Sequence, residues 1–227
     1  MMLDRDAPDG YYDEPRPEVT ACIPLDARTI IDVGCASGAL GRSLKALRPG
    51  VQVRGVEPVA AQAERAREVL DDVSHGSADD PLPAHWPAPD CVIFADVLEH
   101  LVDPWQTLRR YRELLKPGGT IVASVPNVAN RVVLKGLLRM RWDYTEYGIL
   151  DRTHLRFFTR DTALEMFEAC GFEIRYVGRN VEMLGKKPLG SFIRKLIAKE
   201  NGRQRKFPRP LAWLIDAYTF QYLIVAE

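Results

Sequence analysis

The feature that most constrains the fold of this chain is the stretch from Thr29 to Leu44, which reads TIIDVGCASGALGRSL. Its apolar first half, with Ile30 and Ile31, is typical of a buried strand, and the leucines of its second half recur at helical spacing. A short turn with two glycines joins the halves. Glycine allows a backbone to approach a ligand closely, and the free N–H groups at a helix start attract polar groups. The stretch therefore predicts a strand, a ligand-binding turn and a helix.

Apolar runs alternate with helical patterns along the rest of the chain. Strands are predicted at 29–33, 51–56, 91–95, 120–125, 172–177 and 220–226, with a short strand before His75, and helices at 18–23, 38–48, 59–70, 105–115, 128–140 and 159–170. This alternation predicts an α/β fold with a parallel, doubly wound sheet. Ligands bind such sheets beyond the carboxyl ends of the strands, where Asp32, Glu57, Ser77 and Asp96 fall.

Composition limits the class of protein. The chain has 227 residues, of which 46% are hydrophobic and 27% charged, so it suits one globular domain. Basic and acidic residues number 31 each, so the net charge does not favour a nucleic-acid partner. The four cysteines form no CxxC pair, which indicates reduced thiols rather than disulfides or a zinc site. The polar N-terminus is unlike a signal peptide and no apolar run is long enough to span a bilayer, so we predict a cytoplasmic protein.

Two classes of nucleotide-binding protein fit this spacing, the dinucleotide oxidoreductases and the methyltransferases. A dinucleotide site requires the pattern GxGxxG around a pyrophosphate. Here the turn Gly34–Gly38 reads GCASG, and Asp32 before it would repel a phosphate. Glu57, at the end of the second strand, stands where such folds place a carboxylate for ribose hydroxyls.

Several motifs favour the second class. In order, the chain carries IDVGCASG, the acidic Glu57, HGSADDPLP, PDCVIFADVLEHLVDP and LLKPGGTIVASVPN. In these motifs, over about residues 25–178, it resembles the class I S-adenosylmethionine-dependent methyltransferases. The resemblance implies a Rossmann-like, seven-stranded sheet, mostly parallel with an antiparallel last strand, and helical lid and insert segments.

The resemblance also implies S-adenosylmethionine as the cofactor and assigns residues to it. Asp32 would lie near the amino group of the cofactor, and Glu57 would accept hydrogen bonds from two ribose hydroxyls. The turn glycines would let the backbone pass the methionine part. Ala36 departs from the family pattern, in which many members have glycine. The implied cofactor residues are Asp32, Gly34, Cys35, Ala36, Gly38, Glu57, Pro58, Ser77, Ala78, Ala95 and Asp96.

His100 and His154 are the candidate catalytic residues. Methyl transfer from a sulfonium is an in-line displacement, for which an enzyme supplies positioning and, for a hydroxyl acceptor, a base. His100 follows the fourth strand, and His154 lies in LDRTHLRFFT, which resembles a segment of methyltransferases linked to sugar, glycan and natural-product pathways. That segment has two arginines and two aromatic residues suited to an acceptor. The alternative is that both histidines brace loops, whereas His75 and His85 are expected at the surface.

A metal site is a further alternative. Asp96, Glu99, His100 and His154 together resemble the metal site of some quinone-pathway and small-RNA methyltransferases. Oxygen and nitrogen ligands of this kind suit Mg²⁺ or a borderline divalent cation. Those families usually carry glutamate at the position of Asp96, and the shorter side chain argues against the site. The preferred prediction is therefore a site without a metal.

The chain is predicted to form a single methyltransferase domain with four parts. These are an N-terminal arm (1–28), a cofactor-binding core (29–126), a substrate lid (127–158) and a basic insert (185–210). The insert has nine basic residues against one acidic residue. It is expected to be a solvated insert, with peripheral contact to an anionic membrane or an anionic substrate as the alternative.

The arm and the lid each have two interpretations. The arm either packs onto the domain or folds over the ligand, with Tyr12 and Arg16 in polar contact with it. The lid helix is expected to cover the domain with an apolar inner face and a solvated basic face, and the aromatic residues after it would hold an acceptor such as a sugar. The residues expected to face inward are Val132, Val133, Leu137 and Leu138.

The sequence thus predicts an S-adenosylmethionine-dependent O-methyltransferase. Its acceptor would be a small hydroxylated molecule, with a sugar or glycan intermediate favoured. One alternative is a non-catalytic accessory protein that keeps the cofactor pocket and serves a partner enzyme. Another is a metal-dependent O-methyltransferase of the quinone-pathway type. The sequence names neither the acceptor nor the oligomeric state.

Overall fold

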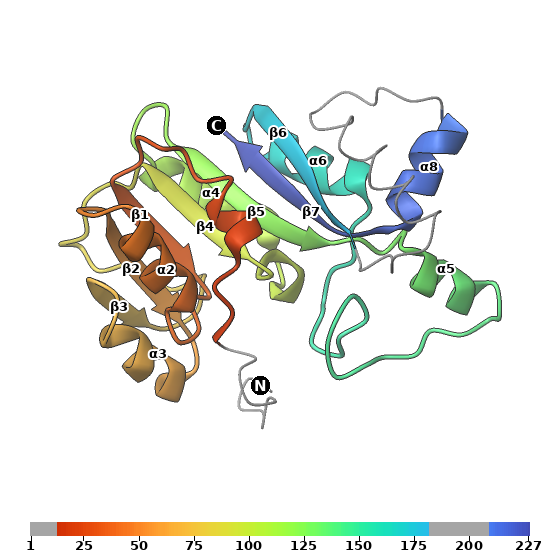
Figure 1. The fold of residues 1–227 in the computed structure, drawn as a ribbon, viewed down its shortest axis with the longest axis horizontal. Coiled ribbons are helices and arrows are strands. Elements are labelled where there is room, and N and C mark those ends of the chain that lie inside the picture. The colour runs from red at the N-terminus through yellow and green to blue at the C-terminus, as the bar shows by residue number, and fades with distance from the viewer. Residues whose placement is uncertain (1–12, 182–208) are drawn as a thin grey trace.

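A seven-stranded sheet in the order β3-β2-β1-β4-β5-β7-β6 forms the centre of the molecule (Figure 1). The computed structural model describes residues 13–181 and 209–227. β1 pairs in parallel with β2 and β4, β2 with β3, and β4 with β5. β7 lies antiparallel between β5 and β6. This is the Rossmann-like, mostly parallel sheet that the sequence predicts, closed by an antiparallel last strand.

The bounds of most elements agree with the sequence patterns to within a few residues. The strands are β1 (Thr29–Val33), β2 (Gln52–Glu57), β3 (Asp72–His75), β4 (Cys91–Ala95), β5 (Thr120–Pro126), β6 (Ile174–Val181) and β7 (Thr219–Ala226). The helices are α1 (Pro17–Thr20), α2 (Ala39–Leu47), α3 (Ala60–Arg67), α4 (Pro104–Leu114), α5 (Arg131–Leu137), α6 (Arg160–Ala169) and α8 (Arg209–Ala217), with a 3₁₀ turn, η2 (Leu98–His100). Residues 185–208 of the basic insert, and Tyr12, lie outside the described residues.

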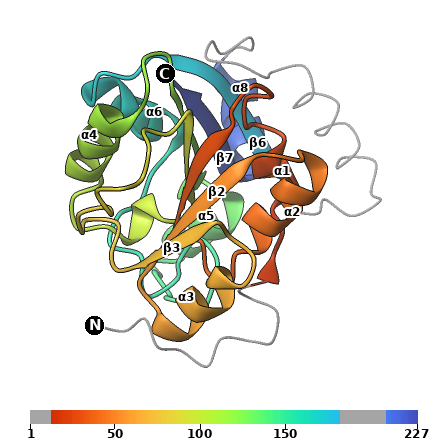
Figure 2. The ribbon, with the colours of Figure 1, turned by 90° about the vertical axis from the view of Figure 1, so that its left-hand side faces the viewer.

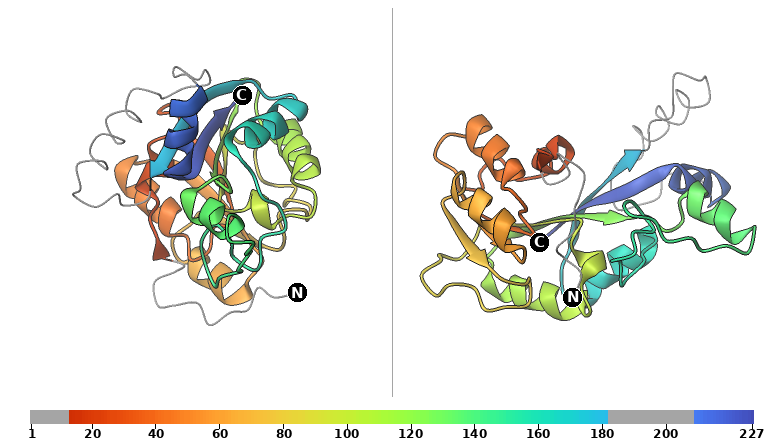
Figure 3. Two further views of the ribbon diagram at one scale, coloured as in Figure 1. Left: turned by 90° about the vertical axis from the view of Figure 1, so that its right-hand side faces the viewer. Right: turned by 90° about the horizontal axis from the view of Figure 1, so that it is seen from below.

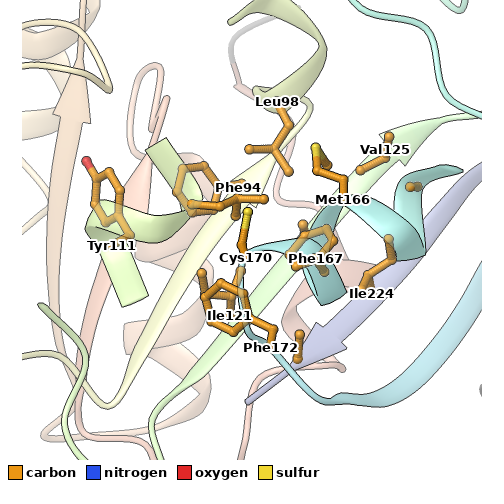
Figure 4. Close-up of a cluster of buried hydrophobic side chains, with 14 of the residues drawn as sticks. Phe94, Leu98, Tyr111, Ile121, Val125, Met166, Phe167, Cys170, Phe172 and Ile224 are labelled. Atoms are coloured by element: carbon orange, nitrogen blue, oxygen red, sulfur yellow. The ribbon is translucent and has the colours of Figure 1, made fainter. Parts of the chain in front are cut away.

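Helices cover both faces of the sheet (Figure 2), and an apolar core lies on each face. α1, α2 and α3 pack on one face through residues such as Val19, Leu44 and Ala63. α4 and α6 pack on the other, where Phe94 and Tyr111 meet edge to face with ring centroids 5.1 Å apart (Figure 4). All residues of β1 and β5 are buried, as central strands of a covered parallel sheet require.

The lid helix α5 is shorter than the predicted helix at 128–140. It starts after Asn130, whose side-chain oxygen accepts a hydrogen bond from the Val132 N–H at 2.9 Å. Of the residues expected to face inward, only Val133 is buried. Val132, Leu137 and Leu138 are 54%, 47% and 85% exposed, so the expected apolar inner face is wrong for these three.

Buried asparagines fix the start of the lid to the far end of the sheet. The Asn127 side chain donates to the carbonyl oxygens of Asp216 and Thr219 at 2.8 and 3.0 Å, and Asn130 donates to the Thr219 oxygen at 3.0 Å. α5 and α8 consequently lie together at one end of the molecule (Figure 3). Within the described ranges, none of the helices has the length and apolar character needed to cross a membrane.

Candidate functional site

The turn between β1 and α2 has an unusual backbone. Gly34, Ala36 and Gly38 all have positive φ angles, of 72°, 47° and 81°. A Cβ atom on Gly34 would lie 2.6 Å from Cγ2 of Val97, so only glycine fits there without movement. Ala36 is a rare non-glycine residue in the left-handed region. The Cys35 side chain packs in the core under this turn, so only the backbone of Cys35 faces a ligand.

Asp32 is buried at the end of β1, with only 2% of its surface exposed. Burial, and to a lesser extent the nearby Glu57 charge, raise the pKa of its carboxyl group to about 7, while Arg16 opposes the shift. A cationic group beside Asp32 would therefore be strongly favoured, because it would stabilise the carboxylate that burial destabilises.

Glu57 stands at the end of β2 and shapes the same turn. Its two carboxylate oxygens accept hydrogen bonds from the N–H groups of Ala36 and Val59, each at 2.8 Å. Burial raises the pKa of Glu57, although these two hydrogen bonds lower it. Each carboxylate oxygen keeps a further lone pair for a hydroxyl. Pro58, which follows, is half-buried, and its carbonyl lies 3.2 Å from Nε2 of the exposed His75.

The loop after β3 holds Ser77 and Ala78 next to this turn. The Ser77 N–H donates to a carboxylate oxygen of Asp80 at 2.6 Å. Arg110, on α4, donates to the carbonyl oxygens of Ala78 and Asp80 at 2.7 and 2.6 Å. The loop is therefore braced by a helix on the opposite face of the sheet, at two of the residues that the sequence assigns to the cofactor.

Asp96, directly after Ala95 at the end of β4, is the most connected carboxylate at this edge of the sheet. Its backbone is left-handed, with a φ of 57°. Its carboxylate accepts hydrogen bonds from Ser124 of β5, at 2.9 Å, and from Gln221 of β7. It also pairs with the guanidinium of Arg16. Asp96 is thus engaged by three strands or segments that are distant in the sequence.

The described part of the N-terminal arm runs across these strand ends. Arg16 caps α1 with a left-handed backbone, and its guanidinium reaches Asp96 and, at 3.2 Å, the Ser124 hydroxyl. Nearby, the Asp13 carboxylate accepts from the Ser37 hydroxyl at 2.6 Å and pairs with Arg65 of α3 at 2.9 Å. The arm therefore contacts the turn after β1, helix α3 and the end of β4.

His100 and His154 lie side by side. Their ring centroids are 4.7 Å apart at an angle of 74°. The Nδ1 atoms face carbonyl oxygens, of Thr153 at 3.3 Å for His100 and of Ile149 at 2.9 Å for His154. A tautomer with hydrogen on Nδ1 satisfies both contacts and leaves each Nε2 with a free lone pair. Burial lowers the pKa of both imidazoles, and each histidine is therefore neutral near pH 7.

Glu99 adds a buried carboxylate to this pair. It is 1% exposed, and neither of its carboxylate oxygens has a hydrogen-bond partner among the described residues. One oxygen lies 3.9 Å from Nε2 of His154. Burial, and then the Asp96 charge, raise the pKa of Glu99 well above its usual range. Potential ligand atoms of Glu99, His100 and His154 lie within 4.8 Å of one another, whereas Asp96 is not part of this group.

Aromatic side chains line the approach to the histidines. The Phe157 ring lies 6.2 Å from that of His154 and 5.1 Å from that of Trp142. The two arginines predicted to bind acceptor groups have partners of their own. Arg152 pairs with Glu146, and Arg156 donates to the Val102 carbonyl oxygen at 3.1 Å.

Comparison with known families decides the class of this protein. A family model described as a methyltransferase domain matches residues 11–177. The chain belongs to this methyltransferase family. Together with the fold, the match identifies it as a class I S-adenosylmethionine-dependent methyltransferase.

Relatives of this methyltransferase include enzymes of quinone biosynthesis. It is 27% identical over 182 residues to a ubiquinone biosynthesis O-methyltransferase of Saccharophagus degradans. This alignment covers 73% of this chain and 75% of the relative. A second such protein, from Cereibacter sphaeroides, is also 27% identical, over 69% of this chain and 64% of its own length.

Solved structures show the same fold. A methyltransferase of Thermotoga maritima, described as a possible histamine N-methyltransferase, aligns with a TM-score of 0.61 and 16% identity, over 92% of this chain and 85% of that one. Human N-acetylserotonin methyltransferase, solved with S-adenosylmethionine, aligns with a TM-score of 0.55 and 18% identity, over 93% of this chain and 50% of that one.

Several residues at the site of this methyltransferase were not predicted from the sequence. Ser124 and Gln221 reach Asp96 from β5 and β7, and Arg110 braces the loop after β3 from α4. No motif around Gln221 or Arg110 indicated a role. Ser124 does lie inside the motif LLKPGGTIVASVPN, at the carboxyl end of a predicted strand, which was the one available signal.

Proposed function

We propose that this methyltransferase transfers a methyl group to a hydroxyl of a small, ring-bearing acceptor, with a sugar or glycan intermediate as the first candidate. The observation that carries the proposal is the pair of neutral imidazoles of His100 and His154, each with its Nε2 lone pair free. A neutral imidazole can accept the hydroxyl proton as the acceptor oxygen attacks. Phe157 and Trp142 beside it provide the aromatic faces that a sugar or phenol ring packs against.

The buried charges at the strand ends suit the cofactor. When bound, S-adenosylmethionine supplies an electrophilic methyl group on a sulfonium. Asp32 would hold the amino group, because a cation there offsets the burial that raises the Asp32 pKa. Arg16 is close enough to oppose that shift and would hold the carboxylate of the methionine part. Glu57 would accept the ribose hydroxyls with its remaining lone pairs.

A second candidate is a metal-dependent O-methyltransferase of the quinone-pathway type with a phenolic acceptor, a class that the relatives named for ubiquinone biosynthesis bring into consideration for this chain. The observation in its favour is Glu99, since a buried carboxylate without hydrogen bonds is costly unless a cation meets it. Glu99, His100 and His154 would hold a divalent cation, and their Nδ1 contacts to carbonyl oxygens are the usual supports of metal-binding histidines. The cation would lower the pKa of a bound hydroxyl.

Substitution of the histidines tests the first proposal. Asparagine keeps a donor at the position of Nδ1 but lacks the Nε2 base, so His154→Asn and His100→Asn should retain the local fold. We expect the variant that removes the base to lower kcat by about 10²–10⁴-fold, with an unchanged Kd for S-adenosylmethionine measured by calorimetry. The exposed His85 offers the control variant His85→Asn. Near-full kcat in both site variants would show that neither histidine is the base.

The acceptor and the metal are tested on the same preparation. The purified protein is assayed against nucleotide sugars and against catechols, with and without a chelator, and with Glu99→Gln as the matched variant. Loss of turnover on chelation, restored by Mg²⁺ in the native protein but not in Glu99→Gln, would favour the second candidate. Binding of the cofactor without turnover of any acceptor would favour the non-catalytic accessory role.

A further inference from the structure

The proposed function makes no use of a surface along α5 and the turn that follows it, which we call the lid tip. It consists of the exposed apolar residues Leu137, Leu138 and Met140 and the basic residues Arg131, Lys135, Arg139 and Arg141. Leu138 is 85% exposed and Met140 is 95% exposed. Exposed apolar residues that are grouped in this way mark a surface that another apolar phase or partner covers.

The backbone at Met140 is strained, and no packing of its side chain compensates for this strain. The Met140 N–H donates to the Leu137 oxygen and the Arg141 N–H to the Gly136 oxygen, both at 2.9 Å. These are the two hydrogen bonds of a Schellman motif, in which the left-handed residue is usually glycine. Here that residue is methionine, with a φ of 57°. Because its side chain is almost fully exposed, contacts inside the molecule do not offset the strain, and such an outlier suggests a function.

The charges around the tip limit what can cover it. Arg131, Lys135, Arg139 and Arg141 are all exposed, and Arg141 pairs with Asp143 at 2.7 Å. In the described ranges, neither Lys135 nor Arg139 has an acidic partner. A second copy docked by two-fold symmetry would place this basic group against itself. Basic residues around an apolar centre are instead the composition of segments that bind anionic bilayers.

We propose that the lid tip docks onto an anionic membrane surface. Leu138 and Met140 enter the headgroup region, and Lys135 and Arg139 face the lipid phosphates. α8 lies at the same end of the molecule, and its Trp213 is 60% exposed, which suits the membrane interface (Figure 3). Trp142, just beyond the tip, contacts Phe157 next to His154, so the docked face adjoins the site proposed for the acceptor.

Vesicle flotation of the full-length protein tests the proposal. The vesicles are of phosphatidylcholine alone or of phosphatidylcholine and phosphatidylglycerol in equal parts. We expect binding to the anionic vesicles that weakens with added salt. The double variants Leu138→Ser/Met140→Gly and Lys135→Glu/Arg139→Glu should each reduce partitioning about tenfold or more. Met140→Gly alone should not lower Tm, because glycine suits the left-handed backbone, so lost binding cannot be ascribed to unfolding.

Matched control residues lie on the loop between α1 and β1, at the amino ends of the parallel strands. Leu25 is 83% exposed and Arg28 is also exposed, so Leu25→Ser and Arg28→Glu each make one change of the same type, apolar to polar or basic to acidic, away from the tip. They should leave partitioning unchanged. Absence of binding by the native protein, or equal losses in the control variants, would overturn the proposal. A dimer that forms without vesicles and is abolished by Leu138→Ser would also overturn it, because the tip would then be a protein interface.

Discussion

At the scale of single residues, the three carboxyl groups at the ends of β1, β2 and β4 are stabilised very differently. Asp96 has a guanidinium and two side-chain donors, and Glu57 has two backbone N–H groups. Asp32 is dominated by burial, which raises its pKa to about 7. Of the three, Asp32 is therefore the residue whose negative charge is least favourable in the folded protein without a ligand.

Replacement of the Asp32 carboxyl group should stabilise the folded protein and weaken its binding of the cofactor. Asp32 keeps its proton in the folded state up to about pH 7 but loses it near its usual value of 3.8 in the unfolded state. The native protein therefore loses stability as pH rises between these values, and the loss is constant above pH 7. Asp32→Asn removes the ionisation, so we expect it to raise the free energy of unfolding at pH 8 by roughly 1–3 kcal/mol, and hardly at pH 4. Chemical denaturation across pH measures this, and calorimetry should show at least about tenfold weaker cofactor binding.

Asp90 supplies a control with the opposite sign. Although burial raises its pKa, hydrogen bonds from Lys116 and from the N–H groups of Arg28 and Thr29 lower it overall. Asp90 thus stabilises the fold above its unfolded pKa, and this contribution disappears as pH falls through the folded value. Asp90→Asn should therefore be less stable than the native protein at neutral pH and approach it in acid. A pH-independent difference for Asp32→Asn would contradict the assignment.

At the scale of elements, the core helices follow their sequence patterns and the lid does not. Leu40 and Leu44 lie on the buried face of α2, whereas Leu47 at its end is exposed, and the glycines of the turn before it are readable in the sequence. The turn that follows the lid helix contains a left-handed methionine, Met140, and hydrophobic periodicity carries no signal for that. Four of its apolar residues were expected to face inward, yet of these only Val133 is buried.

Asn130 should therefore contribute more than an ordinary helix cap. It caps α5 through the Val132 N–H and also donates to the Thr219 oxygen from a fully buried position. We expect Asn130→Ala to destabilise the protein by about 2–3 kcal/mol and to speed amide exchange in α5. Asp103→Ala is the matched control, because Asp103 caps α4 by accepting from the Gln106 N–H at 3.0 Å on an exposed surface. It should cost about 1 kcal/mol. Equal costs would show that the second contact of Asn130 adds nothing.

At the scale of the whole molecule, one polar cluster joins the N-terminal arm to both halves of the sheet. Arg16 contacts Asp96 after β4, Ser124 on β5 and Gln221 on β7. Burial of Arg16 lowers its pKa, but the Asp96 and Glu18 charges outweigh burial and raise the pKa overall. The Arg16 guanidinium therefore links the arm to the parallel strands and to the antiparallel strand.

Arg16→Gln should consequently affect stability and cofactor binding together. The substitution leaves Asp96 without its ion pair, so we expect a loss of about 2 kcal/mol in the free energy of unfolding. The cofactor should bind at least about tenfold more weakly, because its carboxylate loses a charged partner. Thermal melts with and without S-adenosylmethionine measure both effects. Arg65→Gln is the control, since Arg65 forms an exposed ion pair with Asp13 and should change neither quantity appreciably. Unchanged cofactor binding in Arg16→Gln would exclude the proposed role.

Local patterns in the sequence determined the order of strands and helices, the turn after β1 and the acidic residues at strand ends. Each of these depends on the periodicity or backbone freedom of neighbouring residues, which is written in consecutive positions. The tertiary structure decided which distant side chains meet. Ser124 and Gln221 both reach Asp96 because β5 and β7 are paired. Glu99 is shielded from solvent because the loop with His154 packs over it. Burial, pKa and strain at these residues follow from surroundings that no local pattern records.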